Sequence, residues 1–83
     1  MKKKNLRLVI ALRIEAEPLL DLYKLKKYQN KKKSFIIYNN IYLNIWLVIS
    51  GIGNINASKA TKHLYKESPK SKKNIWVNIG MAG

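Results

Sequence analysis

The stretch "LRLVIALR", Leu6 to Arg13, decides the fold. Its run of leucine and β-branched residues is typical of a strand covered on both faces, as in a parallel sheet. The next stretch, "IEAEPLLDLYKLKKY" (14–28), predicts a helix, because its carboxylates come first, its lysines come last and Pro18 occupies a first-turn position. The apolar stripe expected on that helix consists of Ile14, Leu19, Leu20 and Tyr23.

Three further stretches complete the expected order of elements. "KKSFIIYNNIYLNIWLVIS" (32–50) predicts a hairpin that turns at Asn39-Asn40, and "NIWVNIG" (74–80) reads as another buried strand. Between them, "INASKATKHLYKES" (55–68) predicts a second helix with Ile55, Ala60 and Leu64 on one face. Strands that alternate with helices predict an α/β three-layer sandwich with a mixed, partly parallel sheet.

The charge of the chain opens one functional alternative. Its 83 residues carry 17 basic and four acidic side chains, a formal net charge of +13. Such an excess of positive charge favours binding to nucleic acid or to an anionic surface. The lysines gather in three clusters, Lys2–Lys4, Lys31–Lys33 and Lys70–Lys73, whereas arginine, the usual residue for bidentate recognition, occurs only twice. The alternative function is therefore a small basic nucleic-acid-binding module that acts through lysine-rich loops.

Several classes of protein are excluded or disfavoured. The chain has no cysteine and a single histidine, so disulfides and thiolate metal sites are excluded and no metal-ligand pattern occurs. The N-terminal lysines imitate a signal peptide, but Arg7 and Arg13 interrupt the apolar run and no cleavage site follows. The longest apolar stretch, around 41–49, is shorter than the ~18 residues of a membrane span. We therefore expect a cytoplasmic protein without metal, cofactor or membrane contact.

The carboxyl ends of the expected strands predict a ligand crevice. Ligands of open α/β sheets bind there, so the loops 11–15, 50–54 and 80–83 are expected to converge. Gly51 and Gly53 permit a tight turn into a helix N-terminus, which attracts anions or hydroxyls; the alternative is a turn that only needs small residues. Glu15 suits a general base toward water or a partner of a sugar hydroxyl; the alternative is a carboxylate that complements the helix dipole. Trp46 and Trp76 are expected in the core.

Three motifs together resemble a known family. "VIALRIEAEPLL", "VISGIGNINASKAT" and "WVNIGMAG" are similar, in that order, to the N-terminal part of the nucleoside phosphorylase / nucleosidase superfamily, over about Leu8 to Gly83. The nearest branch is that of methylthioadenosine/S-adenosylhomocysteine nucleosidase. The resemblance implies cleavage of the N-glycosidic bond of a purine nucleoside, with Glu15 as the catalytic residue that positions or deprotonates the attacking water. The substrate-binding residues it implies are Ala11, Leu12, Ser50, Gly51, Ile52, Gly53, Met81, Ala82 and Gly83.

The chain departs from the family pattern at identifiable points. Asn54 stands where the nucleosidases have lysine, and Met81 replaces a serine beside the water or phosphate position. The phosphorylase branch has an early Gly-Asp-Pro loop that is missing from this sequence, which favours water over phosphate as the co-substrate. The family's ribose-gripping Met-Glu pair and base-protonating Asp have no counterpart within residues 1–83. We therefore expect a truncated N-terminal portion of a single domain, inactive alone, whose complete form is a homo-oligomer.

Overall fold

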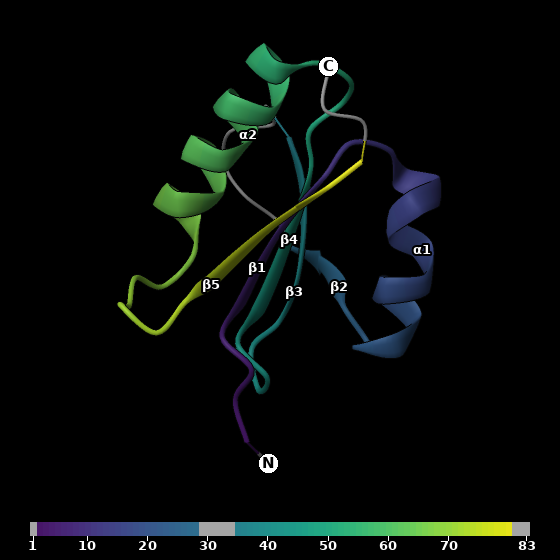
Figure 1. The fold of residues 1–83 in the computed structure, drawn as a ribbon. Coiled ribbons are helices and arrows are strands. Elements are labelled where there is room, and N and C mark those ends of the chain that lie inside the picture. Colours follow the sequence, from purple (N-terminus) through teal and green to yellow (C-terminus); the bar gives the residue numbers. More distant parts are fainter. Residues whose placement is uncertain (1, 29–34, 81–83) are drawn as a thin grey trace.

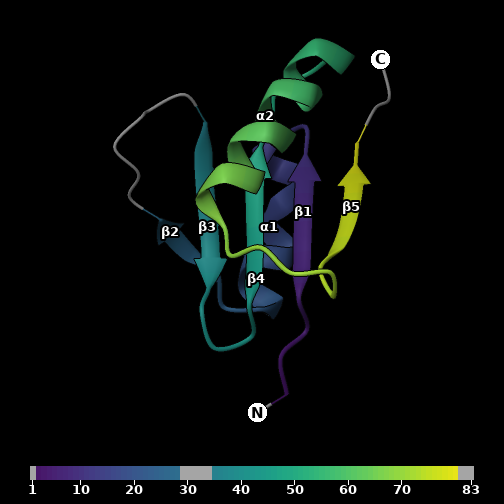
Figure 2. The same ribbon diagram turned by 90° about the vertical axis from the view of Figure 1, so that its left-hand side faces the viewer.

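The computed structural model describes residues 2–28 and 35–80, which form one sheet with a helix on each face (Figures 1 and 2). Its elements are β1 (Leu6–Ile10), α1 (Arg13–Leu22), β2 (Lys26–Tyr28), β3 (Ile36–Asn40), β4 (Ile45–Ile49), α2 (Asn54–Glu67) and β5 (Ile75–Ile79). The strand order is β2-β3-β4-β1-β5. β1 is parallel to β4 and β5, whereas β2 and β3 run antiparallel to their neighbours. The predicted α/β sandwich with a mixed, partly parallel sheet is confirmed.

The core lies on both sides of β1, as the apolar run predicts. Successive side chains of a strand point to opposite faces. Leu8 and Ile10 accordingly join the cluster that includes Ala16 of α1, while Val9 joins the cluster that includes Ala60 and Leu64 of α2. Trp46 is buried in this second cluster, as predicted. The predicted face of α2 is right at Ala60 and Leu64, which are the buried residues of this helix, but wrong at Ile55, which is 72% exposed in its first turn.

The first helix is shorter than the sequence predicts. It ends at Leu22, and Lys26–Tyr28 forms β2 against β3 instead of a last helical turn. Lys24 breaks the helix with a φ of 53°, and the N–H of the buried Leu25 bonds to the Leu20 carbonyl. A three-residue strand with two exposed lysines has no periodic signal of its own, so it resembles a cationic helix end. Such lysines are common on edge strands, where they discourage further pairing.

Two details of α1 also differ from expectation. Pro18 lies inside the helix, not in its first turn, because the helix begins at Arg13. Ile14 is 73% exposed and does not belong to the apolar stripe, which is formed by Ala16 with the half-buried Leu19, Leu20 and Tyr23.

The hairpin β3–β4 is confirmed, but its turn lies later than predicted. β3 continues through Asn39 and Asn40, and residues 41–44 make the turn. Asn40 stays in the strand because its side-chain amide donates to the Tyr23 carbonyl at 2.8 Å and its Oδ1 accepts from the Leu43 N–H at 3.2 Å. Asn44 adopts the positive φ, 54°, that the turn needs.

β5 is an exposed edge strand, although its sequence reads as buried. Among the described residues it pairs only with β1, at the rim of the sheet (Figure 2). Ile75, Trp76 and Val77 are 55%, 39% and 37% exposed, because both helices cover the middle of the sheet. Trp76 contacts Tyr65 with a ring-centroid separation of 6.4 Å and is not a core residue.

Arg7 is a fully buried charge in β1, an interior strand of the sheet. Its guanidinium donates to the carbonyl of Leu6 at 3.0 Å, to the carbonyl and Oδ1 of Asn44 at 2.9 and 3.1 Å, and to the carbonyl of Pro69 at 2.8 Å. Burial lowers the pKa of Arg7. These bonds tie β1 to the turn before β4 and to the loop after α2, two segments far apart in the chain.

Replacement of Arg7 by alanine is expected to lower the free energy of unfolding by about 2–4 kcal/mol, because it leaves a cavity and buried carbonyls without donors. Urea unfolding followed by circular dichroism measures the loss. Arg13→Ala is the matched control: Arg13 is exposed, so the same change there should stay within about 0.5 kcal/mol. Equal effects of the two substitutions would show that the Arg7 bonds do not stabilise the fold.

Candidate active site

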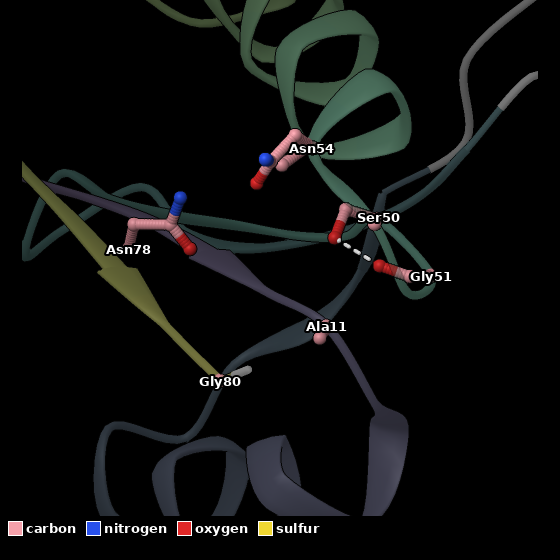
Figure 3. Close-up of a pocket in the computed structure, with 8 residues that line it drawn as sticks. Ala11, Ser50, Gly51, Asn54, Asn78 and Gly80 are labelled. Carbon is pink, nitrogen blue, oxygen red and sulfur yellow. Dashed lines mark hydrogen bonds between the residues drawn. The ribbon is translucent and has the colours of Figure 1, made fainter. Parts of the chain in front are cut away.

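A pocket of about 190 Å³ lies where the carboxyl ends of β1, β4 and β5 meet the first turn of α2 (Figure 3). It is lined by Ala11, Ser50, Gly51, Gly53, Asn54, Ala57, Asn78 and Gly80. The three loops that were expected to converge thus contribute to one cavity.

Backbone hydrogen bonds beyond the strand ends hold these loops together. The Ser50 N–H donates to the Ile10 carbonyl at 2.9 Å, and the Ala11 N–H donates to the Ile79 carbonyl at 3.2 Å. The Gly51 N–H then donates to the Ala11 carbonyl at 2.9 Å. Main-chain hydrogen bonds therefore hold the three loops of the pocket in place relative to one another.

Ser50, Gly51 and Gly53 carry the chain from β4 into α2. The Ser50 side chain is buried and its hydroxyl donates to the Gly51 carbonyl at 2.8 Å (Figure 3). Gly51 and Gly53 have φ values of 83° and 106°, which residues other than glycine adopt only at an energetic cost. This turn brings the first-turn N–H groups of α2, which have no partners within the helix, to the pocket.

Glu15 lies against the pocket wall and not among the lining residues. Its Oε1 accepts a hydrogen bond from the Leu12 N–H at 3.1 Å, so the carboxylate caps α1. The same oxygen is 3.2 Å from the position that a Cβ on Gly80 would occupy. Because a carboxylate has a second oxygen, the capping bond fixes the orientation of Glu15 without using up its capacity as an acceptor. The cap and the general base are therefore compatible at this position.

The structure places the sequence-predicted site residues in three groups. Ala11, Ser50, Gly51 and Gly53 line the pocket. Leu12 and Ile52 are 39% and 63% exposed and do not line it. Met81, Ala82 and Gly83 lie outside the described residues.

Two polar lining residues, Asn54 and Asn78, lie within the motifs that carry the resemblance but were not among the predicted substrate-binding residues. Figure 3 shows their amide groups projecting from α2 and β5 into the space between these elements. The available signal was an asparagine within an apolar strand two residues before Gly80, and another directly after Gly53. All the lining side chains are uncharged, so the described pocket offers neutral donors and acceptors that suit hydroxyl or amide groups of a ligand.

Comparisons with known proteins identify no relative: no protein-family model, curated protein or solved structure matches the chain. Within residues 2–28 and 35–80, no helix is long and apolar enough to cross a membrane. No group of three or more metal-ligating side chains occurs in the same part of the chain.

Gly80 must remain glycine if Glu15 is to keep its place. A Cβ at Gly80 would lie 2.8 Å from the Ala11 Cβ, whereas a Cβ at Gly53 would meet nothing within 4 Å. Both glycines have positive φ, so Gly53→Ala is expected to cost about 1–3 kcal/mol in backbone strain alone. Gly80→Ala should add about 1–3 kcal/mol from overpacking and displace the Glu15 carboxylate.

Urea unfolding measures both losses, and the amide resonance of Leu12 reports the bond to Glu15. The chemical shift of the Leu12 amide should change in Gly80→Ala and stay the same in Gly53→Ala. Equal stabilities with an unmoved Leu12 resonance would contradict this account of the wall.

Proposed function

We propose that the pocket binds a purine nucleoside and that the site serves cleavage of its N-glycosidic bond. The observation that carries the proposal is the Glu15 carboxylate beside Gly80, at the wall of a pocket built from the three motifs that resemble the nucleosidases. The neutral donors and acceptors of Ser50, Asn54 and Asn78 suit the hydroxyl groups of a ribose.

Glu15 is the proposed general base. A water molecule at the pocket side of the carboxylate gives a proton to Glu15 as its oxygen attacks the anomeric carbon, and the C–N bond breaks with both electrons passing to the purine. The lining side chains include neither arginine nor lysine to bind phosphate, which favours water as the co-substrate over phosphorolysis.

Departure of the purine also needs a proton donor and stabilisation of the positively charged sugar. Among the described residues, the pocket lining contains no acid. We therefore expect the 83-residue chain to bind nucleoside without measurable steady-state turnover, and to release the base only slowly, within a single turnover. The same proposal includes a cytoplasmic location and, by the family resemblance, assembly as a homo-oligomer without metal or cofactor.

The test is a nitrogen-15 chemical-shift titration of the chain with 5′-methylthioadenosine. Binding should shift the amide resonances of Ala11, Gly51, Gly53 and Gly80, because these residues line the pocket. The absence of shifts at millimolar nucleoside, or shifts confined to β2 and β3, would overturn the proposal.

The role of Glu15 is tested separately with excess protein in a single-turnover assay of adenine release. Glu15→Gln keeps an oxygen that accepts the Leu12 N–H, so folding and binding should persist while release falls by about 100-fold or more. Glu17→Gln is the matched control, because Glu17 is an exposed residue of the same helix. Equal release by the two variants would remove Glu15 from the reaction.

A further inference from the structure

The end of the sheet opposite the pocket gathers segments that are distant in sequence. The Lys4 N–H donates to the Leu43 carbonyl at 2.8 Å, and the Ile75 N–H donates to the Asn5 carbonyl at 2.8 Å. The segment 2–5 therefore lies between the β3–β4 turn and the start of β5. In Figure 2 the N-terminal segment leaves the lower end of β1, with the β3–β4 turn on one side of it and the loop between α2 and β5 on the other.

This end of the molecule, which we term the basic end, concentrates positive charge. Its lysines are all exposed and come from two of the three sequence clusters: Lys2, Lys3, Lys4, Lys70, Lys72 and Lys73. The segments 2–5, 41–44 and 69–76 contain no acidic residue. Lys31–Lys33, the third cluster, lies outside the described residues. The positive charge of the basic end is thus not offset by acidic side chains within its own segments.

The acidic residue nearest in sequence to this end, Glu67, is engaged elsewhere. Burial of Tyr28, and then the charge of Glu67 and a hydrogen bond to it, raise the pKa of Tyr28. These effects place the Glu67 carboxylate near Tyr28 of β2, at the opposite edge of the sheet from β5.

Three exposed aromatic rings accompany the lysines. Tyr42 is 82% exposed at the tip of the β3–β4 turn, and Tyr65 is 52% exposed near the end of α2. Tyr65 contacts Trp76, and the Lys70 ammonium lies 4.9 Å from the centre of its ring. Proteins commonly bind single-stranded nucleic acid through exposed aromatic rings beside cations, because bases stack on the rings while phosphates pair with the cations.

We propose that the basic end binds single-stranded nucleic acid. Lysines 70, 72 and 73, with those of the N-terminal segment, contact backbone phosphates, and bases stack on Tyr42 and on the Tyr65–Trp76 pair. Lysine presents a point charge without the bidentate geometry that reads bases, so binding should depend on salt and little on sequence. The surface lies away from the pocket, and this inference does not rest on the proposed nucleosidase function.

Fluorescence anisotropy of a labelled oligothymidylate of about 15 nucleotides tests the charge. The triple variant Lys70→Gln/Lys72→Gln/Lys73→Gln should bind at least about tenfold more weakly, and its slope of log affinity against log salt should fall by about 2. The control, Lys27→Gln/Lys59→Gln/Lys62→Gln, removes the same charge from exposed lysines elsewhere and should weaken binding by less than about threefold. Equal losses in the two triples would overturn the proposal.

Stacking is tested at the β3–β4 turn. Tyr42→Ala should weaken binding by about fivefold or more, because a base loses its stacking partner. Ile41→Ala, at the adjacent and similarly exposed position, should leave affinity unchanged. Tighter binding of duplex than of single strand, or equal binding to phosphatidylserine vesicles, would mean that the surface recognises anionic charge alone and would overturn the proposal. Glu15→Gln should leave oligonucleotide affinity intact, which separates this result from the test of the pocket.

Discussion

The pairing of β1 with both β4 and β5 in one register is the constraint on which the rest of the structure depends. Ile10 pairs with Ile49 on one side and with Ile79 on the other, so three strands leave the sheet at the same level. Because all three run parallel, their carboxyl ends form a single rim, and glycines there allow the chain to turn without filling the space. A shift of either neighbour by one residue would turn its side chains to the opposite face and separate the walls of the pocket.

The same register aligns the amino ends, where Leu6 pairs with Ile45 and with Ile75. Arg7 lies beside this rim and needs carbonyl oxygens from two other segments, those of Asn44 and Pro69. A buried guanidinium without such acceptors would be strongly unfavourable, so the charge discriminates against arrangements in which these loops lie elsewhere. Arg7 thus reinforces at one end of the sheet the alignment that positions the pocket at the other.

Sequence patterns predicted those parts of the fold that depend on local burial. The apolar run of β1, the hairpin and the Ala60–Leu64 face of α2 each carry their own periodic signal. β2 has no periodic signal of its own. It forms because it pairs with β3, a segment further along the chain, and the three residues of β2 do not by themselves indicate that pairing. The pocket loops followed from the rule that parallel strands bind ligands at their carboxyl ends, but Asn78 did not. The Asn78 side chain lies on the α2 side of the sheet because Asn78 pairs with Val9, whose side chain packs on that same side.

The distribution of charge within this small chain bears on how its two ends can coexist. Although the sequence carries 15 lysines, the residue that follows Gly53 at the start of α2 is an asparagine, and the pocket lining is uncharged. A lysine there would oppose the positive end of the helix dipole, whereas an asparagine does not. A ligand rich in phosphate is drawn over long range to the exposed lysines of the basic end, while a neutral sugar gains nothing there and finds donors and acceptors in the pocket. The distribution of charge therefore separates the two proposed binding sites, one for polyanions and one for neutral ligands, at opposite ends of one sheet, so that they need not compete.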